Sequence, residues 1–283
     1  MQHFASGWHK SYYGKADVIA YRLNRDGKTA EGASPVFGAN FTMLIYGDAF
    51  WPTYIAGDNT DLIATDSMKN FIQREMFNYE GADLEDCCRY LARKFLALYP
   101  QVAGVQISAA QLPYAALPDS TVAFTPTGPD CATVRMELTR QGIVEIVSGI
   151  RSLKLLRLGG SAFEGFLRDE YTTLPDIANR PLHMWLDLEW TYTSPFAPFT
   201  CGATTADVRR IVHEVFNHFE SGSIQQVIYQ IGTKILADIE SIDEVQLEAK
   251  NRTWDTIAEL GDQLGVYTEP RPAFGCLGLR LKR

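Results

Sequence analysis

The chain has 283 residues, and because a domain commonly takes about 150 residues, the length suggests two domains or one large one. Hydrophobic residues make up 46% of the chain and charged residues 21%, a composition that excludes the disordered and collagen-like classes. The net charge of −8 argues against a general nucleic-acid or anionic-membrane binder, since such proteins need a basic surface. We therefore expect a folded protein without a nucleic-acid partner.

The cysteines indicate a reducing compartment. They number five, no Cys-x-x-Cys is present, and Cys87 and Cys88 are adjacent, so neither a disulfide framework nor a thiolate zinc site is expected. The first residues lack the apolar core of a signal peptide and the last three are not Ser-Lys-Leu, which favours the cytoplasm. The uncharged segment 95–118 contains Pro100 and Pro113, which argues against a membrane helix.

In chain order, the first half predicts two strands, two helices and further strands. Residues 12–23 and 41–56 alternate apolar and polar side chains, the period of half-buried antiparallel strands. Asp66 and Ser67 mark the N-cap of a first helix, and Asp83 marks that of a second helix, whose apolar stripe falls at positions 84, 88, 91, 95 and 98. Further strands are expected at 102–108, 121–124 and 133–138.

The second half repeats the same order of elements. Residues 67–110 align without a gap with the residues 140 positions later, for example 105–109 with 245–249, and we interpret this as an internal duplication. The predicted domains are residues 1–141 and 142–283, each a strand-strand-helix-helix-strand-strand unit. The expected elements of the second are strands at 144–158 and 183–192, helices from about Thr205 and Ser223, and strands near Val245 and at 277–281.

This order of elements predicts an α+β fold with antiparallel sheets and with helices on one face of each sheet. A sheet of this kind leaves an edge strand and one face uncovered. Assembly of several copies into an oligomeric β-barrel would close those edges.

Metal and nucleotide sites are not indicated. His213 and His218 are five residues apart, which places them about 140° apart around a helix instead of on one face, as a zinc-binding helix requires. His183 stands alone in a predicted strand. No glycine-rich phosphate loop and no Gly-x-Ser-x-Gly nucleophile motif occurs, so neither a metal nor a cofactor is expected.

Two densely polar segments need another explanation. The first, 57–70, links a strand to a helix, and helix capping by the residues at 65–67 is its simplest role. The second, 163–175, combines three acids, an arginine and several hydroxyls with aromatic residues. An inter-subunit salt network would account for this second composition equally well.

Five ordered segments carry a resemblance to one family. They are Tyr-Tyr-Gly-Lys at 12–15, Ala-Thr-Asp-Ser-Met-Lys-Asn at 64–70, Gly-Phe-Leu-Arg-Asp-Glu-Tyr-Thr-Thr-Leu at 165–174, Ser-Ile-Gln at 223–225 and Tyr-Thr-Glu-Pro-Arg-Pro at 267–272. With these segments at the family's spacing, the chain resembles urate oxidase (uricase) over nearly its whole length. The resemblance implies the tunnelling fold, with two tandem units per chain, and a homotetrameric barrel with active sites at subunit interfaces.

The resemblance also implies a reaction and the residues that carry it. Urate, O₂ and water would give 5-hydroxyisourate and H₂O₂, with O₂ as co-substrate and no metal or organic cofactor. The residues that it assigns to catalysis are Lys15, Thr65 and Thr253. Those that it assigns to substrate binding are Thr65, Asp66, Phe163, Arg180, Ile224, Gln225 and Asn251.

The implied roles suit a planar anion. Arg180, which follows Phe163 at the family's spacing, would pair two-pronged with one edge of the purine, and Gln225 would bond the opposite edge. Phe163 would stack on the ring. The remaining implied contacts are a backbone N–H of Ile224, a position for O₂ or water at Asn251, and backbone N–H groups of Thr65 and Asp66 from a neighbouring subunit.

The proton relay departs from the family pattern. Lys15 would be the base and the Thr65 hydroxyl would relay the proton, but many uricases carry a histidine where this chain has Thr253. The third proton carrier is therefore open between Thr253, water and another residue. Two alternatives stay in view: a non-catalytic purine-binding paralogue, and a pterin or purine enzyme of the same fold, which would need a zinc site.

Overall fold

The computed structural model describes residues 4–5, 7, 11–25, 34–200, 205–261, 263–270 and 272–283. It divides into two compact units. Unit 1 is Met1–Gly149 with Thr191–Gly202, and unit 2 is Ile150–Trp190 with Ala203–Arg283. Because a short segment of the second half belongs to unit 1, the domain boundary at 141/142 stays a prediction.

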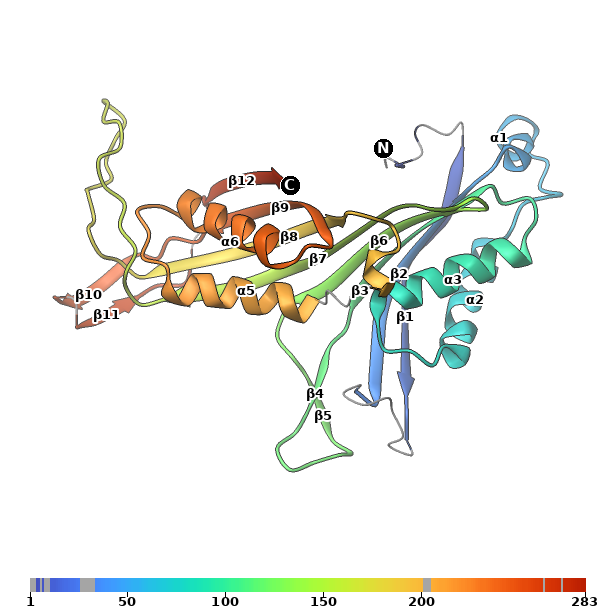
Figure 1. Ribbon diagram of the computed structural model, residues 1–283, viewed down its shortest axis with the longest axis horizontal. Helices are drawn as coiled ribbons and strands as arrows, with labels where there is room; N and C mark the ends of the chain where they lie inside the picture. The colour runs from blue at the N-terminus through green and yellow to red at the C-terminus, as the bar shows by residue number, and fades with distance from the viewer. Residues whose placement is uncertain are drawn as a thin grey trace. The chain divides into compact units, whose positions relative to one another are not determined.

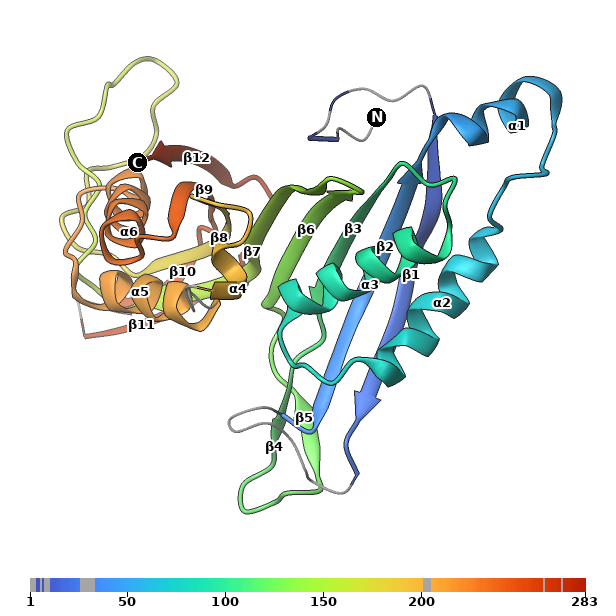
Figure 2. The same cartoon turned by 45° about the vertical axis from the view of Figure 1, so that its right-hand side comes forward.

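Unit 1 is an antiparallel sheet with two long helices on one face (Figures 1 and 2). The strand order is β1-β2-β3-β6, and α2 and α3 connect β2 to β3. The sheet and helices are β1 (Tyr12–Leu23), β2 (Val36–Tyr46), α2 (Thr65–Asn78), α3 (Leu84–Leu98), β3 (Gly104–Gln111) and β6 (Cys131–Thr139). Smaller elements are the 3₁₀ turn η1 (Asp48–Phe50), α1 (Trp51–Ala56), the hairpin β4 (Tyr114–Ala116) and β5 (Phe124–Pro126), and α4 (Ala197–Thr200).

Unit 2 repeats this arrangement with strand order β7-β8-β9-β12. Helix α6 packs on β9 and β12, and α5 packs on α6. The elements are β7 (Gly142–Arg157, which starts in unit 1), β8 (Leu182–Tyr192), α5 (Thr205–His218), α6 (Ile224–Asp238), β9 (Ile242–Asn251) and β12 (Gly275–Lys282), with a hairpin of β10 (Thr256–Leu260) and β11 (Leu264–Tyr267). The predicted α+β fold with antiparallel sheets is confirmed.

The buried side chains follow the two periods expected from the sequence. On β8, every second residue from Leu182 to Trp190 is buried, as a strand with one covered face requires. On α3, the predicted apolar stripe is buried from Leu84 to Phe95, whereas Leu98 is 57% exposed because the helix ends there. Among the described residues, no helix combines the length and apolarity needed to cross a bilayer.

Three sequence predictions of local structure were wrong. The predicted strand 41–56 ends at Tyr46, and Trp51–Ala56 forms α1, because Pro52 suits the first turn of a helix and Gly57, at φ 66°, ends it. The predicted strand 121–124 is replaced by the β4–β5 hairpin. Helix α2 begins at Thr65, and the backbone of Ala64 takes the N-cap position without a side-chain hydrogen bond.

The 140-residue offset between the two halves of the sequence also relates the long helices of the two units. Helix α5 follows α2 by this same offset at both its first and its last residue, and α6 follows α3 in the same way. The helix pair of unit 2 is therefore in register with that of unit 1, as the interpretation of an internal duplication requires.

Arginine side chains hold the C-terminal ends of the long helices in unit 1. Arg22 of β1 donates to the carbonyls of Tyr79 and Gly81 just after α2, the latter at 2.6 Å. The last carbonyls of a helix have no intrahelical donor and form the negative end of its dipole, so a guanidinium satisfies both needs. At the end of α3, Arg140 donates at 3.0 to 3.2 Å to the carbonyls of Leu96, Tyr99, Pro100 and Val102.

Unit 2 has the same device. Arg157 of β7 donates to the carbonyls of Phe216 and Phe219 at the end of α5, and Arg283 donates to three carbonyls at the end of α6. The acceptors obey the helix offset, which pairs Tyr79 with Phe219, Leu96 with Leu236, Tyr99 with Ile239, and Val102 with Ile242. The acceptor positions thus recur at the helix offset, whereas the donors do not, since Arg157 follows Arg22 by 135 residues and Arg283 follows Arg140 by 143.

One buried acid makes the stability of unit 1 depend on pH. Glu85 in the first turn of α3 is 8% exposed, and its Oε1 accepts a 2.6 Å hydrogen bond from the Ser148 hydroxyl. The Tyr192 hydroxyl donates in turn to Ser148 at 2.9 Å. Burial, and then the charge of Asp83, raise the pKa of Glu85 from 4.5 to about 7, because the ionised carboxylate is poorly solvated there.

We predict that Glu85→Gln stabilises the protein above pH 7. In the wild type, the unfolded chain loses the Glu85 proton near pH 4.5 while the folded chain keeps it until about pH 7. The free energy of unfolding therefore falls across this window, by roughly 3 kcal/mol at most. Glutamine can keep the bond to Ser148 and does not ionise. The free energy of unfolding, measured in urea at pH 5 and at pH 8, should therefore fall less between these pH values in the variant than in the wild type. The exposed Glu80→Gln is the control, and equal pH dependence in all three proteins would contradict the prediction.

Candidate functional site

The predicted site residues fall into two groups, one in each unit. Lys15, Thr65 and Asp66 lie in unit 1. The group in unit 2 consists of Phe163, Arg180, Ile224, Gln225, Asn251 and Thr253.

A β-bulge re-aims the strand directly after Lys15. Between Lys15 and Val18, β1 advances three residues while β2 advances two. Asp17 in the bulge has φ 59°, and its carboxylate accepts a 2.7 Å hydrogen bond from the Asn40 side chain. Bulges locally bend a strand and redirect its side chains, so this one fixes the direction in which the half-buried Lys15 leaves the sheet.

Gly14 lets β1 lie close to β2 next to Lys15. A Cβ atom at this position would lie 1.9 Å from the carbonyl oxygen of Met43. Since that oxygen belongs to the backbone, it could not move aside without shifting the strand. Glycine in the Tyr-Tyr-Gly-Lys motif is therefore required by packing.

The start of α2 brings Asp66 near enough to Lys15 for the lysine charge to act on its carboxylate. The Asp66 carboxylate accepts from the Lys69 ammonium at 2.6 Å and from the Asn70 amide at 2.8 Å. The hydrogen bond from Lys69 is the main reason that the pKa of Asp66 is lowered, and the positive charge of Lys15 contributes. Neither Thr65 nor Asp66 caps the helix through its side chain, so the capping role considered for 65–67 was wrong. The amides of a first turn have no intrahelical acceptor and can bind an external one.

Tyr13 fixes the approach to α2 against β1. Its hydroxyl accepts a 2.9 Å hydrogen bond from the Ile63 N–H, two residues before Thr65. Burial raises the pKa of Tyr13 to about 12, so the hydroxyl stays neutral. The two predicted catalytic residues of unit 1, Lys15 and Thr65, are thereby held on one rigid frame.

In unit 2, Phe163 and Arg180 are placed by a short backbone bridge. Phe163 and Ile177 exchange N–H···O bonds of 2.8 and 3.0 Å, and the Arg180 N–H donates to Ser161 O at 2.9 Å. The Arg180 guanidinium carbon lies 5.6 Å from the centre of the Phe163 ring. Burial lowers the pKa of Arg180, and its buried Nε has no hydrogen-bond partner within the described structure. Phe166 stacks on Phe163 at 4.9 Å.

The start of α6 leaves the Gln225 side chain unused by the helix. The Ser223 hydroxyl accepts from the Gln226 N–H at 3.2 Å, and the Gln226 side chain accepts from the Gly222 N–H at 2.8 Å, a variant of the capping box. The Gln225 side chain is exposed, whereas the Ile224 side chain is buried. The N–H of Ile224 is one of the first-turn amides without an intrahelical acceptor.

Asn251 and Thr253 lie at the end of β9 and share a hollow with Arg180. This hollow has a volume of about 590 Å³. Among the described residues that line it are also His183 and Trp254, but not Phe163, Ile224 or Gln225. Burial lowers the pKa of His183, and the charges of Lys154 and Arg252 lower it further.

The link after Asn251 is anchored by Arg252. Its guanidinium carbon lies 4.0 Å from the centre of the Trp185 ring and 3.9 Å from that of the Phe274 ring. The backbone N–H of Arg252 donates to the carbonyl oxygen of His183 at 3.2 Å. Sequence reasoning missed this anchor and treated His183 as isolated. No periodicity or motif marks either contact, because both depend on which strands become neighbours.

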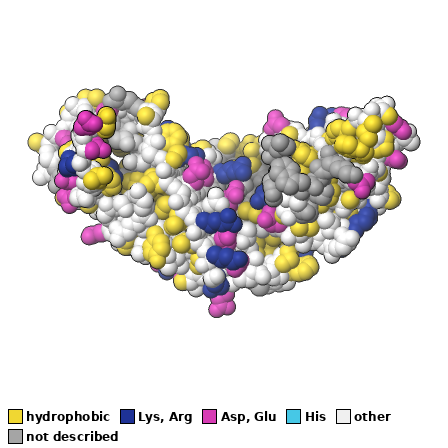
Figure 3. Space-filling view, turned by 90° about the horizontal axis from the view of Figure 1, so that it is seen from above, with side chains coloured by type: hydrophobic (Ala, Val, Ile, Leu, Met, Phe, Trp, Pro, Cys, Tyr) yellow, Lys and Arg dark blue, Asp and Glu magenta, His cyan; other side chains and the backbone are white. Residues whose placement is uncertain are grey.

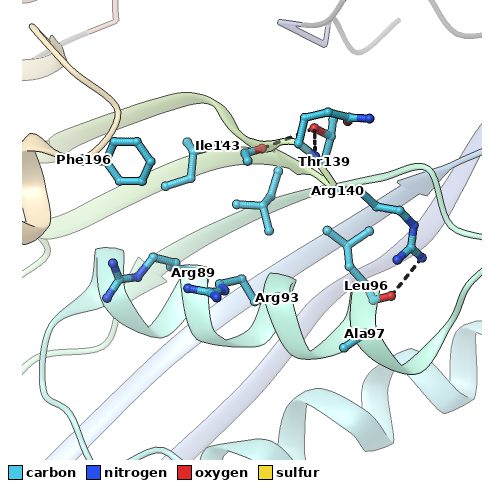
Figure 4. Close-up of a pocket in the computed structure, with 11 residues that line it drawn as sticks. Arg89, Arg93, Leu96, Ala97, Thr139, Arg140, Ile143 and Phe196 are labelled. Carbon is cyan, nitrogen blue, oxygen red and sulfur yellow. Dashed lines mark hydrogen bonds between the residues drawn. The ribbon is translucent and has the colours of Figure 1, made fainter.

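A second hollow, of about 430 Å³, lies in unit 1 and contains none of the predicted site residues. Arg89 and Arg93 project from α3 beside Ile143 and Phe196 (Figure 4). Arg140 at its edge is bound to the end of α3, and Arg89 pairs with Asp86 and lies 3.9 Å from the Phe199 ring. Two of its three arginines are thus occupied by the fold itself.

Metal ligands do not gather in the part of the chain that the structure describes. No group of three or more His, Cys, Asp and Glu side chains is placed to hold an ion there. His213 and His218 lie on α5, Cys87 and Cys88 are buried free thiols, and Cys201 and Arg271 lie outside the described residues.

The fold is mixed α+β with antiparallel sheets and is consistent with the tunnelling fold, and comparisons with known proteins agree with this class. The uricase family model matches residues 146–273. The chain is 32% identical to a uricase of Haloferax volcanii, over 91% of this chain and 93% of that protein. A crystal structure of a uricase from Bacillus fastidious superposes with a TM-score of 0.88 at 33% identity, over 97% of this chain and 94% of that one. The chain belongs to the uricase family.

Some relatives are longer. The chain is 36% identical to the uric acid degradation bifunctional protein PucL of Bacillus subtilis, over 93% of this chain but 59% of that protein. The alignment with a second bifunctional relative, from Bacillus sp. TB-90, covers 58% of that protein. The chain thus spans about three fifths of the length of these two relatives.

We predict that neighbouring glutamines at the start of α6 differ in their effect on stability. Gln226→Ala removes the side-chain acceptor of the Gly222 N–H and should lower the free energy of unfolding by about 1 kcal/mol. Gln225→Ala removes no such bond and should change it by less than about 0.5 kcal/mol. Urea unfolding of the two variants at one protein concentration checks this, and equal losses would contradict the assigned caps.

Proposed function

We propose that this protein oxidises urate with O₂ and water to 5-hydroxyisourate and H₂O₂, in the degradation of urate and without a metal or organic cofactor. Membership of the uricase family is the observation that carries the proposal. Two electrons leave urate and reduce O₂ to H₂O₂, while the oxygen of water becomes the new hydroxyl. The electrons come from the substrate itself, so the protein need only bind, deprotonate and orient.

Unit 2 supplies the groups that would recognise the purine. The Arg180 guanidinium is half-buried, and its Nε has no hydrogen-bond partner among the described residues. It would bond one edge of the urate anion, and the amide of Gln225 would bond the opposite edge. Phe163 would stack on the ring, with Ile224 adding its N–H. Acidic and basic side chains are interspersed over one face of the molecule (Figure 3). The anion is thus captured by particular groups and not by the net charge of −8.

Unit 1 supplies the groups that would move the proton. Lys15 lies in β1 next to a bulge, and Thr65 is the first residue of α2, which packs on β1. In the proposed reaction, the Lys15 amine accepts a proton from urate through the Thr65 hydroxyl. The N–H groups of Thr65 and Asp66 would bind the substrate at the positive end of the α2 dipole.

Asn251 and Thr253 would complete the site on the oxygen side. Asn251 would hold O₂ or water above the ring, and Thr253 takes the third relay position. These two roles are supported by the hollow that Asn251 and Thr253 line together with Arg180.

We propose a homotetramer in which Lys15, Thr65 and Asp66 of one subunit meet the unit 2 group of its neighbour. The sheet order ends in β1 and β12, whose outer edges would otherwise be left unpaired. On β1, Ile19, Tyr21 and Leu23 are 47%, 45% and 59% exposed. Burial of these side chains would favour the pairing of edge strands between subunits.

The first test of the function is turnover by protein freed of metal. After dialysis against a chelator, the protein should abolish the ultraviolet absorbance of urate and release one H₂O₂ per urate. Binding of urate without consumption would instead support the non-catalytic purine-binding alternative. Consumption only after metal is added would support a metal-dependent enzyme of the same fold.

A second test separates the base from the binding groups. Lys15→Met should lower turnover by at least about 100-fold, because it removes the proton acceptor, and should leave anaerobic urate binding nearly unchanged. Gln225→Ala should weaken that binding about tenfold, by the loss of hydrogen bonds to the purine edge. Lys94→Met, which removes the ion pair between the exposed Lys94 of α3 and Glu75 of α2, is the control. Equal loss of binding in Lys15→Met would make Lys15 a binding residue.

A further inference from the structure

We propose that Arg157 is the positioning residue that sets the spacing between the two purine-binding elements of unit 2. One element carries Phe163 and Arg180, and the other is the start of α6 with Ile224 and Gln225. The inference rests on the proposed function and adds to it a residue that does not touch the substrate.

The Arg157 guanidinium bonds both elements at once. One nitrogen, Nη1, donates to Phe216 O at 3.1 Å and to Phe219 O at the end of α5. The other, Nη2, donates to Gly160 O and to the Ser161 hydroxyl, each at 2.7 Å, and to the Ser221 hydroxyl at 3.1 Å. Five acceptors from two separate chain segments thus share one planar side chain.

These acceptors lie where the two elements join. The Ala162 N–H donates to Ser221 O at 2.8 Å, and the Ser221 N–H donates to Gly160 O at 3.1 Å, which ties the two segments side by side. Ser161 O is also the acceptor of the Arg180 N–H. Phe163 follows this junction by one residue on one side, and α6 begins three residues after Ser221 on the other.

Arginine suits this position for geometric reasons. Its planar fork presents several N–H groups in fixed directions, whereas lysine offers one point charge on a flexible stem. Burial lowers the pKa of Arg157, and the guanidinium carbon lies 5.6 Å from the centre of the Phe216 ring. The Arg157 side chain is therefore held in one place. Because it bonds both elements, it also fixes the spacing between Arg180 and Gln225.

The fold supplies a matched control in unit 1. Arg140 likewise donates to four carbonyls, at the end of α3, but joins no purine-binding elements. Arg140→Lys and Arg157→Lys therefore remove comparable helix-end contacts. If Arg157 only stabilises the fold, the two variants should behave alike toward urate.

The test measures urate binding without O₂ and turnover with it, on full-length protein, for the wild type and both variants. Arg157→Lys should raise the urate dissociation constant and KM about tenfold, with a smaller fall in kcat. The reason is that Arg180 and Gln225 would no longer contact the two edges of the purine at the same time. Arg140→Lys should leave the dissociation constant within about twofold, although both variants lose stability. Unchanged urate binding in a folded Arg157→Lys would overturn the inference. A wild type that neither binds nor consumes urate would instead sink the proposed function.

A double-mutant cycle tests positioning directly. In the Gln225→Ala background the start of α6 keeps only the Ile224 N–H as a contact to the purine, so Arg157→Lys should weaken binding by less than about threefold. Full additivity of the two effects would overturn the inference. If Arg157→Lys does not fold, Ser161→Ala and Ser221→Ala each remove one side-chain acceptor, and each should weaken urate binding by about two- to fivefold. No change in either would also count against the inference.

Discussion

The contact on which the architecture depends is that between an arginine of the sheet and the C-terminal carbonyls of a helix. It occurs at α2, α3, α5 and α6, through Arg22, Arg140, Arg157 and Arg283. Each contact satisfies carbonyls that the helix cannot bond itself and brings a positive charge to the negative end of the dipole. Because the arginines come from β1, β7 or residues next to β6 and β12, each bond also sets where its helix lies along the sheet.

In the proposed reaction, the same scaffold carries different chemistry in its two units. In unit 1, a bulge in the first strand and the start of the first long helix present Lys15 and Thr65. In unit 2, the start of the second long helix and the segment 160–180 present Gln225, Phe163 and Arg180. Duplication therefore supplies two sets of helix N-termini on one frame. The proposed reaction uses one set to move a proton and the other to bind a ring.

The sequence predicted most of the frame but not how its parts are fixed, and the site residues it suggested stay a prediction. The limits of β1, the start of α3 at Asp83 and the constant offset between the helix pairs follow from periodicity and capping, which are local properties. The strand predicted across 51–56 failed because alternation continued into a segment where Pro52 and Gly57 favour a short helix. The roles of Arg157, Arg252 and Gln226 were missed because each depends on segments far apart in the chain or on a choice between adjacent like residues.

The acceptors of the four arginines have a consequence for how a duplicated gene can change. They are almost all main-chain carbonyls, which every amino acid provides. The helix residues at these ends can therefore be replaced freely, provided that an arginine still reaches the carbonyls. The chain length between them need not be kept, since Arg22 and Tyr79 are 57 residues apart and Arg157 and Phe219 are 62 apart. Tyr79 and Phe219, or Leu96 and Leu236, are equally good acceptors. Two halves linked by a constant offset can in this way lose nearly all their identical residues and still keep their long helices in register, which is the pattern that this chain displays.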